Sequence, residues 1–526
     1  MTQQDSLVEY GSRRVIITIT AVICALLEVI DTTIVNVALN DMRGSLGATL
    51  NEVSWVITAY SIANVIIVPM TSWLSQQFGR RNYFAASIIL FTVSSFLCGN
   101  ASSINELIIF RFLQGLGGGA LLVTSQTIIT ESYPLEKRAM AQAIYTLGVI
   151  VGPTLGPPLG GYIIDHYSWP NIFYINIPVG IVATLLTMQF VKSPVYTEKR
   201  KPRDVDWTGI ALLAISVGSL QYILEKGQEE DWFSSTAIIV LTVITILGFF
   251  FFIWRELTFR FPVVQLRVLK NGNLRIGVIL SFIMGFGLYG STFIIPLYTQ
   301  SILGWNALQA GMLLVPSSIM IAIMMPIVGQ MIQRGVSQKY MIAGGMGLFF
   351  LYCLFSYYLI TPSTSADNFF WVLMLRGVGL GFLAVPVSTM ALSTLKGQQI
   401  GQGAAFSGMM RQLGGSFGVA IISTFISRQN MQHRSDLVTN LRVDDPAVQQ
   451  HVSSLQAAMM SKGMPSNSAL GSAYKLLDNS VSLQATIMSY MDVFLYIGVL
   501  FLICVPMVLV FVKRSKNKVA LSEAAH

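Results

Sequence analysis

The feature that most constrains the fold is a series of apolar segments, each near the length of about 20 residues that a membrane-spanning helix needs. We count about 14 of them, and they begin near residues 14, 52, 83, 105, 140, 171, 207, 235, 275, 308, 340, 369, 403 and 487. Hydrophobic residues make up 53% of the chain and charged residues only 11%, which excludes a soluble domain of this size. The sequence therefore predicts an all-α polytopic membrane protein with 14 transmembrane helices.

The positions of the basic residues predict the topology. Lysines and arginines gather in alternate loops, at residues 13–14, 80–81, 137–138, 199–203, 267–275 and 513–518, and roughly 23 of the 33 lie on that side. We therefore expect this side and both termini to be cytoplasmic, with no cleavable signal peptide. The same distribution accounts for the net charge of +8 without a nucleic-acid partner.

Two parts of the sequence resemble each other. Arg111 precedes a glycine-rich run in the fourth apolar segment, and Arg376 precedes one in the twelfth, about 260 residues later. Repeated halves with a site between them are typical of transporters. We expect an N-terminal six-helix bundle at residues 1–191, a linker with an inserted helix pair at 192–274, and a C-terminal six-helix bundle at 275–526.

The first apolar segment carries two carboxylates, Glu28 and Asp31, which share one face of a helix because they are three residues apart. A charge at membrane depth is costly and usually marks a pathway, a relay or a binding site. Asp31 would lie roughly 12 Å, and Arg111 roughly 9 Å, from the outer end of its helix, so the two could meet at one level. Three interpretations remain open: a proton switch in which Arg111 biases Asp31, a static structural pair, or an Asp31 that caps a helix break.

Glu28 lies nearer the middle of the membrane, where it could carry protons or attract a cationic ligand. The sequence does not separate these two roles. The ninth segment, the counterpart of the first, has no carboxylate between Leu280 and Gln300, so we expect any proton site in the first half. The candidates for a substrate cavity are Glu28, Asn36, Gln114, Tyr145, Phe286, Tyr289, Arg376 and Arg411, although each aromatic taken singly also fits ordinary packing.

The fifth segment contains glycines at four-residue spacing and three prolines within six residues. Such glycines allow close helix contact, and prolines kink or stiffen a helix. We favour a hinge or a seal between the two halves, with simple packing as the alternative. The residues concerned are Gly148, Gly152, Pro153, Gly156, Pro157, Gly160 and Gly161.

Two loops complete the set of candidate sites. Gly79, Arg80 and Arg81 form a tight turn on the cytoplasmic side, where a role in fixing the topology is sufficient to explain the arginines. On the outer side, a long polar loop runs from about Arg428 to Ser482 and includes helix-compatible stretches such as Ala447 to Met460. It is either a solvated loop or a docking surface for an extracytoplasmic partner.

No enzyme motif competes with a transport function. The sequence has no GxxxxGK[ST] phosphate loop for ATP, and its four histidines lack metal-ligand spacing. The four cysteines all fall in apolar segments, where we expect them to be buried and unpaired. We therefore expect no enzyme, no metal and no cofactor, with the proton gradient as the energy source.

These motifs resemble those of the major facilitator superfamily, and in particular of the 14-helix drug:proton antiporters, the EmrB-type multidrug efflux pumps of Gram-negative bacteria. The resemblance covers nearly the whole chain and is carried by four stretches: Asp31 to Leu39 (DTTIVNVAL), Arg111 to Gly115 (RFLQG), Gly152 to Gly161, and Trp169 to Gly180 (WPNIFYINIPVG). The sequence departs from the family pattern at Asn40, Ser72 and Gln76. Gln76 stands where an acidic residue is usual, which argues against a charge relay through that turn.

The resemblance implies the major facilitator fold, proton coupling by Asp31 and Arg111, and an exporter signature in the fifth segment. It also implies cytoplasmic gating by Gly79, Arg80 and Arg81. A periplasmic adaptor protein and an outer-membrane channel are implied as partners, with the long outer loop as the adaptor contact. Glu28 is not part of the family motif, so its role rests on its position alone.

We expect a proton-driven exporter of lipophilic or amphipathic compounds in the bacterial inner membrane, acting as the permease of a tripartite efflux system. Within transport, the alternative is a dedicated exporter of one metabolite, such as a siderophore or a fatty acid. Outside transport, the alternative is a membrane receptor or scaffold.

Overall fold

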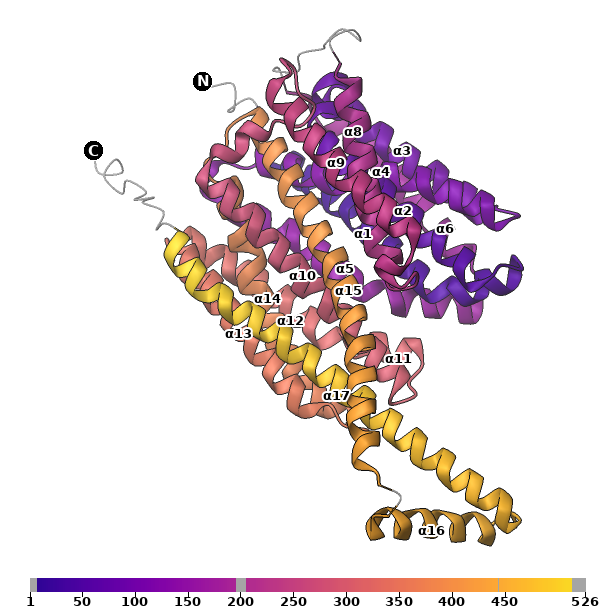
Figure 1. The fold of residues 1–526 in the computed structure, drawn as a ribbon. Coiled ribbons are helices and arrows are strands. Elements are labelled where there is room, and N and C mark those ends of the chain that lie inside the picture. The colour runs from indigo at the N-terminus through magenta and orange to yellow at the C-terminus, as the bar shows by residue number, and fades with distance from the viewer. Residues whose placement is uncertain (1–6, 195–204, 443, 513–526) are drawn as a thin grey trace.

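The computed structural model describes residues 7–194, 205–442 and 444–512. The basic runs at residues 199–203 and 513–518, on which part of the topology prediction rests, lie outside these described residues. Within them, every regular element is a helix, and the long helices run side by side in one bundle (Figure 1). The predicted all-α architecture is therefore confirmed.

The helices fall into three groups along the chain. The first comprises α1 (Gly11–Ser45), α2 (Leu50–Phe78), α3 (Arg80–Gly99), α4 (Ile104–Ser132), α5 (Arg138–His166), the short α6 (Asn171–Tyr174) and α7 (Asn176–Phe190). The second is the pair α8 (Trp207–Lys226) and α9 (Thr236–Thr258). The third comprises α10 (Gly272–Ser301), α11 (Ala307–Met312), α12 (Val315–Gln333), α13 (Gln338–Leu359), α14 (Ala366–Leu392), α15 (Gln398–Asn440), α16 (Pro446–Ser461) and α17 (Ser466–Phe511).

The first and third groups repeat one packing scheme. Helix α1 packs on α5 and α4 as α10 packs on α15 and α14, and α4 packs on α2 and α3 as α14 packs on α12 and α13. The two groups also meet reciprocally, because α2 contacts α15 while α12 contacts α5. We call the first group the first half and the third group the second half. The division of the chain at residues 191 and 274 stays a prediction.

In the described part of the chain, twelve helices are long and apolar enough to cross a membrane, and α5, bent by 42°, would be a thirteenth. Helix α15 is long enough to cross a membrane but is not apolar enough by composition. The part of it at membrane depth is rich in small residues that face other helices. A Cβ on Gly418 would lie 2.9 Å from the carbonyl oxygen of Phe286 in α10, so the two backbones are nearly in contact. Helix α15 therefore fits a fourteenth span, consistent with the predicted count.

The segment from Arg428 to Ser482, predicted as a long outer loop with a helix-compatible stretch at residues 447–460, is mostly helical, and α16 covers that stretch. Helix α15 continues to Asn440 and α17 begins at Ser466, about 21 residues before the predicted start of the last span at 487. With α16 they form a helical hairpin, here called the outer hairpin, that projects from the bundle (Figure 1). Hydropathy does not predict the outer hairpin, because its helices are polar. Their contacts with each other include the ion pair of Arg434 with Asp478 at 2.7 Å.

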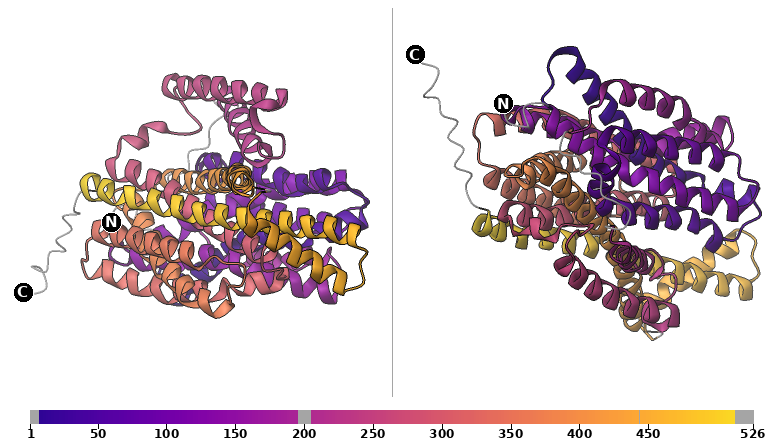
Figure 2. Two further views of the ribbon diagram at one scale, coloured as in Figure 1. Left: turned by 60° about the horizontal axis from the view of Figure 1, so that its bottom comes forward. Right: turned by 90° about the horizontal axis from the view of Figure 1, so that it is seen from above.

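The inserted pair lies at the edge of the molecule, where Figure 2 shows α8 and α9 in magenta. Helix α8 nevertheless bonds to both halves. The Gln221 side-chain amide donates to Ser416 Oγ of α15 at 2.9 Å, and the Lys226 ammonium donates to Asn51 Oδ1 of α2 at 3.1 Å. The pair therefore bridges α2 and α15 towards the end of the bundle that carries the outer hairpin.

Candidate functional site

The structure brings together the two charges that the sequence placed at one depth. Arg111 Nη1 of α4 lies 2.5 Å from Asp31 Oδ2 of α1. Asp31 is 0% and Arg111 1% exposed. A carboxylate and a guanidinium that are both removed from solvent stabilise each other strongly, since either alone would carry a large desolvation penalty.

Two amides complete the surroundings of the Asp31 carboxylate. Gln114 Nε2 of α4 and Asn176 Nδ2 of α7 both donate to Asp31 Oδ1, each at 2.9 Å. The Ser95 hydroxyl of α3 accepts from the same two amides at 3.2 and 3.0 Å. Four helices of the first half therefore meet at one carboxylate. We call Asp31, Ser95, Arg111, Gln114 and Asn176 the Asp31 cluster.

Arg111 has further partners that fix its position. Its Nε donates to the carbonyl oxygen of Val56 at 3.3 Å, and its Nη1 also donates to Gln114 Oε1 at 2.8 Å. The guanidinium carbon lies 4.1 Å from the ring centroid of Tyr60, close enough for a cation–π interaction. The charge is thus held by α2 as well as by α1.

Sequence reasoning missed two members of the Asp31 cluster. Asn176 lies inside the stretch Trp169 to Gly180 that carried the family resemblance, and an amide in an apolar span is a signal that could have found it. Ser95 gave no such signal, since small hydroxyl residues are common in membrane helices. Its place in the cluster follows from the packing of α3 on α4.

Glu28 lies one turn from Asp31 on α1, in a different environment. Its side chain is 5% exposed, and Asn64 Nδ2 of α2 donates to Glu28 Oε1 at 2.9 Å. Among the described residues, Asn64 Oδ1 is buried without a hydrogen-bond partner. Arg411 of α15 interacts electrostatically with Glu28 across the interface between the halves. Glu28 is therefore bonded within the first half and also interacts electrostatically with the second half, whereas the bonds of Asp31 all lie within the first half.

Three of the predicted cavity residues gather around this interface. Arg411 interacts electrostatically with the hydroxyl of Tyr145 on α5, and that hydroxyl donates to the carbonyl oxygen of Leu122 at 3.1 Å. Tyr289 of α10 also interacts with Arg411 and packs against α15. Phe286 instead belongs to the hydrophobic core of the second half.

The other two candidates lie elsewhere. Asn36 is on the exposed side of α1, and the structure does not bring it to the Asp31 cluster. Arg376 of α14 is 2% exposed, and its guanidinium donates to the hydroxyls of Ser291, Ser317 and Thr292 at 2.9, 3.0 and 2.6 Å. Within the part of the chain that the structure describes, no carboxylate pairs with it. The second half therefore repeats the arginine of the first half without the acid.

The glycines and prolines of α5 face different neighbours. A Cβ on Gly152 would lie 2.8 Å from Val29 Cγ1 of α1, whereas Pro157 and Pro158 pack against Gly311 of α11. Gly148, Gly156 and Gly160 also face α1, while Gly161 faces α11. Helix α5, with Pro153 near its bend, thus connects the helix that carries both carboxylates to the second half.

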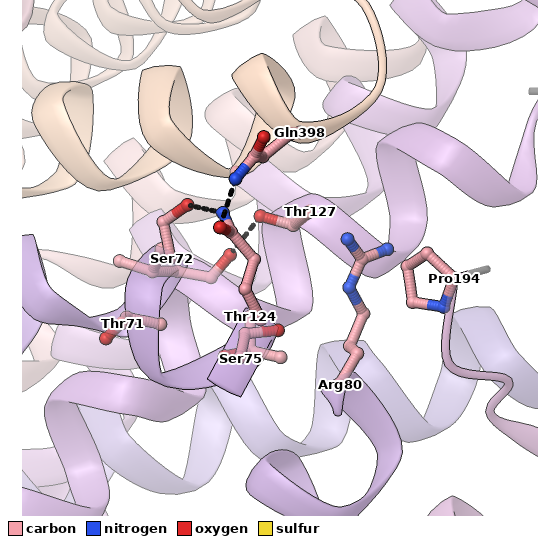
Figure 3. Close-up of a pocket in the computed structure, with 11 residues that line it drawn as sticks. Thr71, Ser72, Ser75, Arg80, Thr124, Thr127, Pro194 and Gln398 are labelled. Carbon is pink, nitrogen blue, oxygen red and sulfur yellow. Dashed lines mark hydrogen bonds between the residues drawn. The ribbon is translucent and has the colours of Figure 1, made fainter. Parts of the chain in front are cut away.

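The turn after α2 joins the halves at the opposite end from the outer hairpin. Gly79 has φ +83°, a value that favours glycine, and Arg80 forms a buried ion pair with Glu131 of α4. Gln76 bonds to Gln398 at the start of α15, beside a small polar pocket (Figure 3). The contact between the halves here is therefore made by two neutral amides.

Comparison with known proteins places these features in a family. The sequence profile of the Major Facilitator Superfamily matches residues 21–419. The multidrug export protein EmrB of Escherichia coli K12 is 33% identical over 509 residues, covering 97% of each chain. The fatty acid resistance protein FarB of Neisseria gonorrhoeae is 32% identical over 94% of this chain and 95% of its own.

A solved structure shows the same fold at low sequence identity. The proton:xylose symporter XylE, a major facilitator superfamily protein, matches 94% of this chain and 96% of its own with a TM-score of 0.59 and 15% identity. The likeness supports the overall arrangement of helices described above.

We predict that Asn176→Leu destabilises the protein, because it removes one of three donors to a buried carboxylate. The expected loss in the free energy of unfolding is about 1–3 kcal/mol, measured by thermal unfolding of the purified protein in detergent. Asn171→Leu is the matched control, since Asn171 bonds locally to Ser168 at 3.1 Å. Equal losses in the two variants would contradict a special role for Asn176.

We also predict that Gly152→Ala is harmful and Gly161→Ala is tolerated. The Cβ of the first would approach the buried Val29 to 2.8 Å, whereas that of the second would lie 3.9 Å from Leu308, an ordinary contact. Overpacking of this kind costs about 1–3 kcal/mol. The same unfolding assay distinguishes the two, and the idea fails if Gly152→Ala matches the wild type.

Proposed function

Because this chain belongs to the major facilitator superfamily, and within it to the family of the EmrB multidrug export proteins, we propose that it exports lipophilic or amphipathic drugs across the bacterial inner membrane in exchange for protons. Family membership makes the chain a membrane transporter and not an enzyme. The proposal includes the topology with both termini in the cytoplasm.

The buried pair of Asp31 and Arg111 carries the proposal of proton coupling. With Asp31 ionised, the pair is neutral and the Asp31 cluster is fully bonded. A proton on Asp31 removes the charge that compensates Arg111, and an uncompensated buried charge costs about 3–5 kcal/mol. Protonation therefore favours any rearrangement of α1 against α4 and α7 that relieves this cost. A proton can drive the transport cycle only through such a differential effect on two conformations.

Drug recognition belongs, in this proposal, to the interface group of Glu28, Tyr145, Tyr289 and Arg411. These side chains come from α1, α5, α10 and α15, so both halves contribute. Their charges and aromatic rings suit amphipathic compounds. Because the glycines of α5 pack against α1, a shift of α1 on protonation would be passed to α5 and from its prolines to α11 of the second half.

A dedicated exporter of one metabolite is the second candidate, and a fatty acid is the substrate that two observations favour. The FarB protein is named for fatty acid resistance and is 32% identical to this chain. A carboxylate substrate would find a counter-charge in Arg411. A panel of cationic, neutral and carboxylate compounds in the same transport assay separates this candidate from a multidrug exporter.

We further propose that the outer hairpin is the contact for a periplasmic adaptor, through which an outer-membrane channel would be reached. Its helices carry exposed apolar side chains, among them Met460 at 46% and Tyr474 at 52% exposure. A protein partner bound to the outer hairpin would cover these side chains.

The central test is drug-induced proton release from the purified protein. We expect Asp31→Asn to abolish it, because the proton site is gone, and Glu28→Gln to weaken drug binding while release at saturating drug persists. Asp165→Asn, an exposed carboxylate at the end of α5, serves as the control and should behave as wild type. Persistence of release in both Asp31→Asn and Glu28→Gln would refute coupling through α1.

The adaptor proposal predicts a split between cellular and purified function. The double variant Met460→Ser and Tyr474→Ser should lower drug resistance towards that of cells lacking the chain, while transport in proteoliposomes stays at the wild-type rate. Tyr358→Ser, at a side chain that is even more exposed but lies on α13 outside the outer hairpin, should leave both intact. Unchanged resistance in the double variant would point to the solvated-segment interpretation.

A further inference from the structure

A pocket of about 390 Å³ lies on the second half, where α11 and the start of α12 face the start of α14. We call it the outer pocket, and its lining includes Trp305, Met312, Leu313, Pro316, Asp367 and Phe370. Its volume falls within the range of about 300–1,000 Å³ that is usual for sites of drug-sized ligands. None of these residues belongs to the Asp31 cluster or to the interface group.

The chemistry of the lining favours a lipophilic cation. Asp367 is the only charged residue that lines the pocket, and in the described part of the chain no ion pair engages its exposed carboxylate. Two aromatic rings, Trp305 and Phe370, and the thioether of Met312 supply polarisable surfaces. Aromatic faces attract cations, and a nearby carboxylate adds a Coulombic term. An anion would find no partner of opposite charge in this lining.

The aromatic wall is held in place by the turn before α11. Gly304 adopts φ +69°, and the backbone N–H of Trp305 donates to the carbonyl oxygen of Thr299 at 3.1 Å. This turn fixes the backbone at Trp305, and the indole itself packs against the hydrophobic core of the second half. One wall of the pocket is therefore held by both the backbone and the core.

Helix α11 also connects the outer pocket to α5. A Cβ on Gly311 would lie 3.1 Å from Pro157 Cβ and 3.3 Å from Pro158 Cδ, so α11 rests directly on the prolines of α5. The neighbouring Met312 lines the pocket. A ligand in the pocket thus lies one helix away from the segment that links α1 to the second half.

We propose that the outer pocket is a second binding site, which takes lipophilic organic cations on the outer side of the membrane after they leave the central interface. The proposal rests on the proposed export function for the source of the cation. Binding itself does not require transport, so the two proposals can be tested separately.

Protection of an introduced cysteine tests the site. The four native cysteines are buried, so Ala366→Cys, at the rim of the pocket, would provide a reactive thiol. We expect tetraphenylphosphonium to slow maleimide labelling of Ala366→Cys, and tetraphenylborate, of the same shape and opposite charge, to have little effect. Adding Asp367→Asn should raise the half-protecting concentration of the cation about fivefold, the factor for an exposed ion pair of roughly 1 kcal/mol.

Two controls make the result specific. Tyr358→Cys, exposed at the outer end of α13, should label at the same rate with and without the cation. Protection of Ala366→Cys should persist when Glu28→Gln and Asp31→Asn are added, because the outer pocket does not use those carboxylates. If transport fails in the wild type but protection remains, the export proposal falls and the site stands.

Three outcomes would overturn the site. Equal protection by tetraphenylborate would show that charge plays no part. Loss of protection in the Glu28→Gln and Asp31→Asn background would show that the effect comes from the central interface. A third outcome is slower labelling of Ala366→Cys in phosphatidylethanolamine nanodiscs than in phosphatidylglycerol nanodiscs, with no further change when the cation is added. That result would show that a lipid amine occupies the pocket instead.

Discussion

The structure of the first half depends on one buried ion pair. Asp31 and Arg111 are 2.5 Å apart and nearly inaccessible to solvent, so neither charge can be exposed or removed without consequence for the other. The bonds that complete the pair come from α3, α4 and α7. The same interaction that fixes the relative positions of these helices is therefore the one that a proton on Asp31 would weaken.

The two halves share a packing scheme but divide the chemistry between them. Arg111 and Arg376 occupy related helices, yet Arg111 has a carboxylate partner and Arg376 has hydroxyl groups. The proposed proton switch of Asp31 and Arg111 therefore lies in the first half, and the second half contributes Arg411 to the interface group. Small residues allow close helix contacts in both halves, since Gly152 of α5 packs against Val29 of α1 and Gly418 of α15 packs against the backbone of Phe286 in α10.

The accuracy of the sequence predictions follows from what each one relied on. The meeting of Asp31 with Arg111 could be predicted because helical rise per residue fixes depth in the membrane. The amide of Asn176 in an apolar span marks that residue as a candidate, but neither its contact with Asp31 nor the place of Ser95 could be predicted, because the rotation of α7 and α3 about their axes is set by packing against other helices. The outer hairpin was predicted as a loop because its helices are polar, and the few apolar side chains that they bury, Val452, Ala469 and Ala473, meet only in the folded structure. The place of α8 against both halves likewise depends on contacts distant in sequence, such as Gln221 with Ser416.

The sequence by itself determined that the chain crosses the membrane many times, that its first apolar segment holds two carboxylates, and that an arginine stands at matching depth. These properties depend on composition and on distance along a helix, which are local. Only the tertiary structure decided that Asp31 bonds to Arg111 while Glu28, one turn away, bonds to Asn64 of α2 and interacts electrostatically with Arg411 of the second half. The outer pocket likewise exists only in the tertiary structure, because its walls come from helices that are about 55 residues apart in the sequence. The physical reason is that hydrogen bonds, ion pairs and cavities depend on which helix faces meet, and this is settled by the packing of the whole bundle.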